Sequence, residues 1–194
     1  MERLLRGDQQ AIGLARLELD HENLLSALAW CEATSGGSRR ALRMASTLWR
    51  YWYARGHGRL GLQVLQRILS RVGNEGAIPE RIEALLGAGL LALDLGEYVV
   101  CRRVYEEALA LTKESGDRAG IARALNGLGA VVGDGEGNYE SAGELFDQSL
   151  ALNRELGNTR AQGIVLSNMG EAALRVEDAG RGRPLYLGIV VLGV

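Results

Sequence analysis

The sequence is poor in the residue types that define several common protein classes. Its 194 residues include only 2 proline and 2 cysteine residues, which excludes a collagen-like chain and a disulfide-stabilised scaffold. The two thiols, Cys31 and Cys101, are also too few to form a structural zinc site. The formal net charge of −2 argues against a general nucleic-acid binder, which needs a basic surface.

Long apolar segments are absent as well. No run of 18 consecutive apolar residues occurs, and the first residues, MERLLRGDQQ, lack the apolar core of a signal peptide. These absences predict a soluble, cytoplasmic protein with no membrane partner. Apolar residues still make up 47% of the chain, which is enough for one domain with a core or for a short repeat array.

Glycine is over-represented, and arginine supplies nearly all of the basic residues. The 27 glycine residues are roughly twice the usual share. Of the 22 basic residues, all but Lys113 are arginine. Because GC-rich coding enriches arginine and glycine, the arginine residues must be judged by position and not by number.

An internal repeat explains many of these glycine residues. The segment 108–129 aligns without a gap with 149–170, and a repeat shorter by one position relates Gly56 to Gly96. A shared period over three or four units indicates a repeat architecture. The coinciding pairs are Leu109 with Leu150, Leu111 with Leu152, Glu114 with Glu155, Gly116 with Gly157, Gly129 with Gly170, Tyr98 with Tyr139, and Tyr105 with Phe146.

Each unit of the repeat is expected to contain two helices. Apolar residues recur at helical spacing in the segments 78–95, 97–115, 121–132, 139–156 and 163–178. Gly116 is expected to end one unit in a left-handed conformation, and Asp117 to cap the next helix. Residues 133–138, with the sequence GDGEGN, are expected to form a loop. The small residues Gly89, Gly129 and Gly170, with Cys101 and Ala142, are expected at close helix contacts.

This pattern resembles the tetratricopeptide repeat (TPR). The matching residues of one unit are Leu128, Gly129, Gly137, Tyr139, Ala142, Phe146 and Ser149. The resemblance implies an all-α fold, a right-handed α-α superhelix that is a TPR-like solenoid of antiparallel helix pairs. Two departures stand out, since glycine replaces the usual helix-ending proline and the period is longer than that of the usual TPR.

The resemblance also implies a domain organisation. Residues 1–40 would form a helical lead-in, and residues 41–178 the repeats, at about 41–78, 79–116, 117–157 and a partial unit at 158–178. Residues 179–194 break the pattern and end in the apolar segment LGIVVLGV. Three interpretations of this tail remain open: it covers the last repeat, it is a frayed end, or it pairs with a partner or another chain.

The N-terminal part resembles one particular group of TPR proteins. The motif Leu19-Asp20-His21-Glu22-Asn23-Leu24, then Ala27, Trp30, Trp49, Trp52 and Arg55-Gly56-His57, is similar to the sensor region of bacterial transcriptional regulators of the AfsR, MalT and LuxR-ATPase (NB-ARC/STAND) kind. The resemblance implies a sensor without its ATPase and DNA-binding parts. No GxxxxGK[ST] phosphate loop occurs, so ATP hydrolysis is not expected. Trp49 and Trp52 are expected to pack between helices.

The residues that could carry catalysis are few. His21 lies near two carboxylates and could act as a general base, but its helical context favours a packing role, and His57 is expected to act as a cap. Cys31 and Cys101 are expected to be inert buried thiols. Asp134 and Glu136 weakly resemble a calcium loop without its ligand spacing. We therefore expect a non-enzymatic protein with no catalytic residue, no metal and no cofactor.

The expected functional surface is the concave groove of the repeat array. The resemblance implies that the first helices of successive units line this groove, which holds a peptide or a partner helix. Arg43, Arg50 and Tyr53 share one helical face, and arginine can bind a carboxylate or phosphate through two hydrogen bonds. A solvated face is the open alternative. The expected groove-lining residues are Arg43, Arg50, Tyr53, Glu83, Leu86, Leu90, Arg123, Asn126, Ser167 and Glu171.

Three functions therefore remain open at the level of sequence. The first is a sensor or scaffold module that binds a protein, a peptide or a small effector. The second is a structural fragment that self-associates through its C-terminal tail. The third, binding of RNA by helical repeats, is weaker because those repeats are shorter than these and have basic binding faces.

Overall fold

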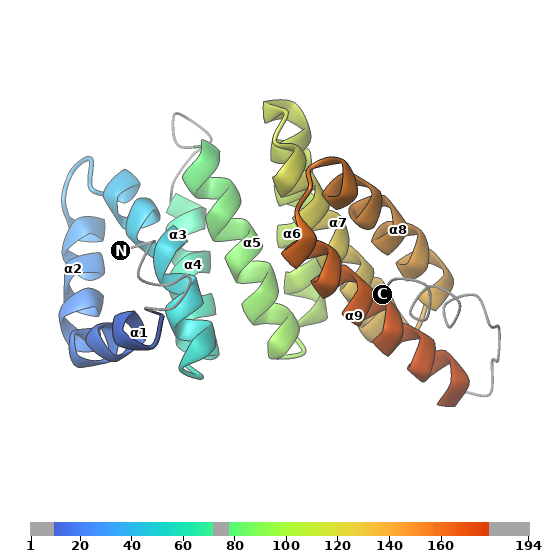
Figure 1. The fold of residues 1–194 in the computed structure, drawn as a ribbon. Helices are drawn as coiled ribbons and strands as arrows, with labels where there is room; N and C mark the ends of the chain where they lie inside the picture. The colour runs from blue at the N-terminus through green and yellow to red at the C-terminus, as the bar shows by residue number, and fades with distance from the viewer. Residues whose placement is uncertain (1–9, 72–77, 179–194) are drawn as a thin grey trace. The chain divides into compact units, whose positions relative to one another are not determined.

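The computed structural model describes residues 10–71 and 78–178 of the chain (Figure 1). Within these residues the protein is all-helical, with nine α-helices and no strand. Residues 179–194, the predicted tail, lie outside the described residues. None of the described helices combines the length and hydropathy that crossing a membrane requires. The chain divides into two compact units, residues 1–100 and 101–194, which are described in turn.

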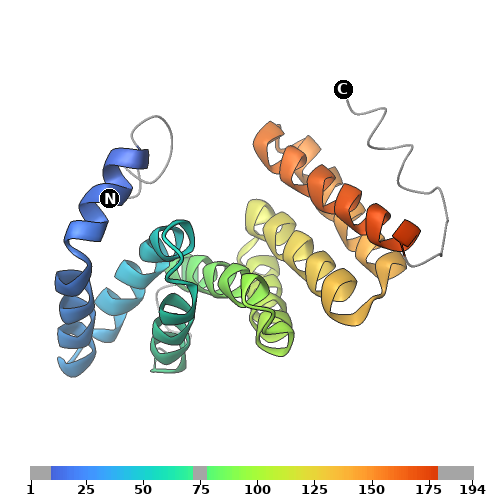
Figure 2. The same cartoon turned by 90° about the horizontal axis from the view of Figure 1, so that it is seen from below.

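The first unit contains five of the described helices. Its helices are α1 (Gln10–Leu19), α2 (His21–Ala33), α3 (Ser38–Ala54), α4 (Gly58–Arg71) and α5 (Ile78–Asp94). Helix α3 packs against both α4 and α5, which also pack against each other, and α2 covers part of α3 (Figures 1 and 2). The predicted helix at 78–95 is thereby confirmed.

The second unit contains the later repeat helices. Helix α6 (Tyr98–Ser115) begins in the last residues of the first unit and lies mostly in the second. It is followed by α7 (Arg118–Ala130), a π-helical turn η2 (Val131–Gly135), α8 (Tyr139–Glu155) and α9 (Thr159–Asp178). Helix α8 packs against both α7 and α9. The helices predicted at 97–115, 121–132, 139–156 and 163–178 are confirmed, apart from the end of α7.

Glycine residues end the helices in the way that the repeat predicts. At Gly56 the backbone φ is +74°, a conformation that only glycine adopts cheaply, and the next N–H, that of His57, donates to the carbonyl of Trp52 at 2.8 Å. This bond closes the last turn of α3 and redirects the chain into α4. The described glycine residues with positive φ are Gly36, Gly56, Gly96, Gly116, Gly137 and Gly157.

Side-chain caps begin the helices that follow these turns. The Asp117 carboxylate accepts a hydrogen bond from the N–H of Gly120 at 2.9 Å, which confirms the predicted cap of α7. The Asn158 side chain accepts from the N–H of Ala161 at 3.1 Å, in the same place one repeat later. Asn138 caps α8 in the same manner, accepting from Ser141 at 3.2 Å.

Each unit packs large aromatic rings onto glycine residues of a neighbouring helix. In the first unit the ring of Trp49 lies on Gly87 of α5, and Trp52 lies on Gly61 of α4. A Cβ atom added at either glycine would come within 3.0 Å of the tryptophan. Both rings are buried, so the prediction that the two tryptophan residues pack between helices is confirmed.

The second unit uses the same contact with smaller rings. The Tyr105 ring of α6 lies on Gly127, and the Phe146 ring of α8 lies on Gly129. The close contact predicted at Gly129 is therefore confirmed, whereas the tighter contact at Gly127 was not predicted. Phe146 belongs to a buried cluster that joins α7, η2, α8 and α9 and includes Val132, Leu150, Val165 and Met169.

The predicted loop at 133–138 is partly wrong, because its first half continues α7 as the π-helical turn η2. The reason is one extra residue. The interval between the turn glycines Gly96 and Gly137 is longer by one position than the interval between the close-contact glycines Gly87 and Gly127. A π-turn absorbs one additional residue within a helix. The closing bond shows the same insertion, since Asn138 donates to a carbonyl six positions back, whereas the equivalent bonds of His57, Glu97, Asp117 and Asn158 span five.

Candidate binding site on α3 and α5

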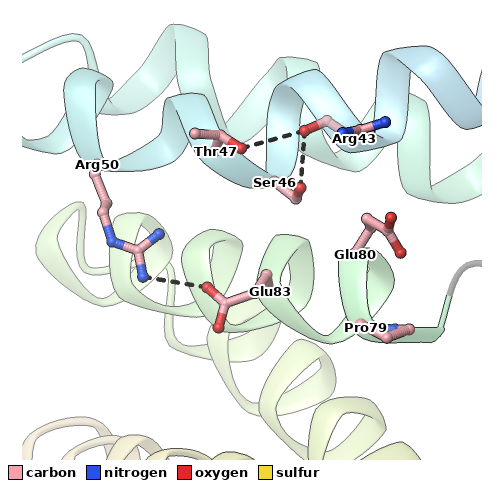
Figure 3. A pocket seen from close by; sticks show the side chains of 7 residues that line it. All are labelled: Arg43, Ser46, Thr47, Arg50, Pro79, Glu80 and Glu83. Carbon is pink, nitrogen blue, oxygen red and sulfur yellow. Dashed lines mark hydrogen bonds and ion pairs between the residues drawn. The ribbon is translucent and has the colours of Figure 1, made fainter. Parts of the chain in front are cut away.

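A pocket of about 270 Å³ lies between α3 and α5 of the first unit (Figure 3). Its α3 wall consists of residues spaced by three and four positions, which places them on one helical face. Its α5 wall comes from the first two turns of that helix. The lining residues are Arg43, Ser46, Thr47 and Arg50 from α3, and Pro79, Glu80 and Glu83 from α5.

Arg50 is held in place at one end of the pocket. Its guanidinium carbon lies 4.3 Å from the centre of the Trp49 ring, and its Nη2 donates to Glu83 Oε2 at 3.2 Å. The Arg50 side chain is only 16% exposed, and that of Glu83 32%. Because Gly87 leaves room for the indole, the close helix contact also builds the platform on which the guanidinium rests.

The other end of the pocket carries a second pair of opposite charges. Figure 3 places Arg43 and Glu80 at this end and Arg50 and Glu83 at the other. Within the described part of the chain, neither the Arg43 guanidinium nor the Glu80 carboxylate makes a hydrogen bond or an ion pair. The hydroxyls of Ser46 and Thr47 donate to the carbonyl of Arg43 at 3.0 and 3.3 Å, so their oxygen lone pairs remain available as acceptors.

The structure brings together three of the predicted groove residues, Arg43, Arg50 and Glu83. Tyr53, one turn beyond Arg50 on α3, is 47% exposed and lies outside the pocket lining. On α5, Leu86 is buried at 3% exposure and Leu90 is half-buried. Their role in a groove stays a prediction.

The predicted residues of the second unit lie on α7 and α9. Asn126 accepts a hydrogen bond from Asn168 at 3.0 Å, which links the two helices. Glu171 pairs with Arg175 at 3.0 Å, and Ser167 is exposed. Burial raises the pKa of Tyr105, and the positive charge of Arg123 opposes that rise. Whether these residues line a common groove stays a prediction.

Sequence reasoning missed Thr47, Pro79 and Glu80 as parts of the pocket. A signal for Glu80 was present, because it precedes Glu83 by three positions and so shares its helical face. Thr47 follows the predicted face by one position, and Pro79 lies in the first turn of α5, where proline is tolerated. Their proximity to α3 depends on the packing of α5, which no local pattern specifies.

Both histidine residues of the chain lie in one polar cluster at the junction of the lead-in and α3. The ring centres of His21 and His57 are 4.7 Å apart, and His21 Nδ1 lies 2.9 Å from Tyr51 Oη. Tyr51 donates to Glu18 Oε2 at 3.2 Å, and His57 Nε2 lies 3.5 Å from the other oxygen. Burial, assisted by the Glu18 charge, raises the pKa of Tyr51 to about 12. His21 was expected to have a helix-surface or packing role, and it is half-buried with its ring against Tyr51 and His57.

The remaining candidates are engaged in the fold. Asp134 pairs with Arg175 at 3.4 Å, and Glu136 forms an ion pair with Arg102. Burial raises the pKa of Asp134, against the lowering effect of Arg175. Cys31 and Cys101 are both buried, as expected, and burial raises the pKa of the Cys101 thiol to about 12.

Comparison with known proteins places this helical chain beside part of much longer proteins. No family model matches the sequence. Proteins named "Putative HTH-type transcriptional regulator" from two strains of Mycobacterium tuberculosis and one of Mycobacterium bovis are each 31% identical to it over 151 residues. The match covers 74% of this chain but only 17% of each relative. The chain is therefore a distant homologue of one segment of proteins that bear a transcriptional regulator's name.

Proposed function

We propose that this chain is a non-enzymatic interaction module of a transcriptional regulator, which binds a protein, a peptide or a small effector between α3 and α5. The observation that carries the proposal is the pocket on these helices. Three of its lining residues, Arg43, Arg50 and Glu83, are positions that the repeat register assigns to the inner face of the array.

The proposal includes a TPR-like superhelix, and the packing within each unit supports it. Aromatic rings lie on Gly87 and Gly127, two glycine residues one repeat apart in the sequence, with the rings supplied by α3 and α6 respectively. Five of the six positive-φ glycine residues follow helices at related repeat positions. Such arrays commonly present an extended binding surface formed by equivalent helices.

A role as part of a larger regulator fits the length of the relatives, since this chain matches 17% of each. A helical segment that binds an effector can control a regulator if the bound and free states differ in helix packing. The pocket meets that requirement in principle, because its walls come from two different helices and a ligand would contact both.

A peptide selection tests the proposal. A random peptide display library is selected on the wild-type protein, and affinities of the recovered peptides are measured on Arg50→Ala and Tyr53→Ala variants. Arg59→Ala serves as the control, because Arg59 lies on α4 and is 71% exposed. We expect Arg50→Ala to weaken the recovered peptides about tenfold or more through loss of a charge-assisted contact, and Tyr53→Ala to weaken those that extend one turn beyond the pocket along α3. Unchanged affinity in both variants would contradict the proposal.

A structural role through self-association is the second candidate. Ile164 and Leu174 of α9 are 51% and 63% exposed, and a second chain could cover them. Light scattering on the chain with and without residues 183–194 tests this candidate. A monomer in both cases would count against it.

A further inference from the structure

The walls of the α3–α5 pocket carry opposite charges in two pairs. On α3, Arg43 and Arg50 are seven positions apart, which is about two helical turns. On α5, Glu80 and Glu83 face them from the first two turns. One pair, Arg50 with Glu83, is closed by an ion pair at 3.2 Å, whereas Arg43 and Glu80 have no partner within the described residues.

Because the pocket carries equal numbers of arginine and glutamate side chains, it disfavours the binding of a simple anion or cation. A bare anion would be attracted by the two guanidinium groups but repelled by both carboxylates, and a bare cation would meet the reverse arrangement. A ligand with one carboxylate and one ammonium group satisfies both walls at once. Its carboxylate can take two hydrogen bonds from the planar guanidinium of Arg43, and its ammonium group can donate to Glu80 and to the hydroxyl oxygens of Ser46 and Thr47.

The size of the pocket limits the ligand further. A volume of about 270 Å³ lies just below the range of about 300–1,000 Å³ typical of sites for drug-sized molecules. A single small zwitterion fits such a space. At the far end the pocket is already closed by Arg50, which rests on Trp49 and is tied to Glu83.

From these observations we infer that the pocket binds a free α-amino acid, with the α-carboxylate on Arg43 and the α-ammonium group on Glu80. The inference rests on the proposed function and names the effector class of that same site. Because Arg43 belongs to α3 and Glu80 to α5, the bound zwitterion completes the open charge pair and ties the two helices together. Occupancy therefore reduces the freedom of α5 to move against α3, which is how a small effector can alter a helical array.

The experiment measures binding of the standard L-amino acids to the full chain by NMR titration and calorimetry. Each amino acid that binds is compared with its N-acetyl form, which lacks the ammonium group, and its amide, which lacks the carboxylate. We expect at least one amino acid with an uncharged side chain to bind and to perturb resonances of α3 and α5. Both blocked forms should bind about tenfold or more weakly, since each has lost a charge-assisted contact.

Variants locate the site. Arg43→Gln and Glu80→Gln are each expected to weaken binding about tenfold or more, with no change in the far-ultraviolet circular dichroism spectrum. Arg59→Gln, which removes one positive charge from the exposed face of α4, is the matched control and should bind like the wild type. Binding that persists in both pocket variants, or that is equal for the blocked forms, overturns the inference.

The outcome also separates this inference from the proposed function. If no amino acid binds but the selected peptides still depend on Arg50 and Tyr53, the pocket is a peptide site and the amino-acid inference is wrong. If an amino acid binds and its binding depends on Arg43 and Glu80, the inference stands whatever the peptide selection shows.

Discussion

Both units pack aromatic rings onto glycine residues, but they differ in the polar side chains that link their helices. In the first unit, carboxylates link separate helices: Glu32 of α2 binds Arg67 and Arg71 of α4, and Glu18 of α1 meets Tyr51 of α3. The second unit also uses carboxylates, since Asp134 of η2 pairs with Arg175 of α9, and it adds a buried link in which Ser149 of α8 donates to the carbonyl of Ala122 on α7 at 2.7 Å. The repeat therefore specifies where helices touch, and residues outside its pattern decide what else a unit can do.

This difference explains why the described pocket belongs to the first unit. Arg50, which lines one end of the pocket, rests on the large Trp49 ring, and the walls carry charged residues on facing helices. At the equivalent contact of the second unit a tyrosine ring lies on Gly127, and the nearby buried polar groups bond to the backbone.

Removing one aromatic ring from each unit should have the largest effect. Trp52→Ala and Phe146→Ala each delete a buried ring, with 1% and 2% exposure, from a contact with glycine. We expect each variant to lower the free energy of unfolding by about 3–5 kcal/mol, as measured by urea denaturation. A loss below about 1 kcal/mol in one unit only would show that this contact does not stabilise the two units alike.

Adding a methyl group at the glycine residues tests the contacts between aromatic rings and glycine in a second way. Gly87→Ala and Gly127→Ala place a Cβ within 3.0 Å of Trp49 and Tyr105, and the cost should be about 1–3 kcal/mol. Gly163→Ala on α9 is the matched control, because a Cβ there meets nothing within 4 Å. It should stabilise the protein by about 0.5–1 kcal/mol through the better helix propensity of alanine. Equal effects at all three sites would refute the role of close packing.

The glycine positions also show what the sequence could and could not predict. The positive-φ turn glycines were predictable, because each follows a periodic apolar segment at a regular interval. The close contacts at Gly87 and Gly127 were not predictable. The sequence indicated Gly89 and Gly129, two positions later, and which glycine the ring meets depends on the tilt of Trp49 or Tyr105. Likewise the register predicted Arg43, Arg50 and Glu83, but Glu80 entered the site only through the angle at which α5 packs.

Alkaline pH should weaken both units, for the same physical reason but through different groups. The pKa of Tyr51 is raised from its ordinary value of 10 to about 12, so the unfolded chain loses this proton first. Stability should therefore fall as pH rises from about 10 to 12, and Tyr51→Phe should reduce that slope. In the second unit Cys101, with its pKa raised from 9.0 to about 12, acts in the same sense over pH 9 to 12.

The measurement is the free energy of unfolding as a function of pH for the wild type, Tyr51→Phe and Cys101→Ala. Each variant should flatten the curve within its own range and leave the slope below about pH 8 as it is. A wild-type slope that persists in both variants would show that neither buried group governs the alkaline loss.

The smallest change in the free energy of unfolding is expected from deleting Gly135, the extra residue at the end of α7. Deleting Gly135 gives the turn glycines of the two repeats the same spacing as the close-contact glycines and removes the need for the π-turn η2. The closing bond from Asn138 to the Val132 carbonyl would then span five positions, as it does from His57 to Trp52. Since Val131 and Val132 keep their places before the deletion, we expect the free energy of unfolding to change by about 1 kcal/mol or less.

A deletion inside a regular helix supplies the comparison. Removing Gly143 from α8 rotates every later residue by about 100° about the helix axis and turns Phe146 and Leu150 away from the core, so it should prevent folding of the second unit. If deleting Gly135 were equally harmful, the extra residue would be needed to hold Asp134 against Arg175 rather than being absorbed by the π-turn. Circular dichroism and urea denaturation of both deletions distinguish these outcomes, because only a tolerated insertion can be removed without loss of cooperative unfolding.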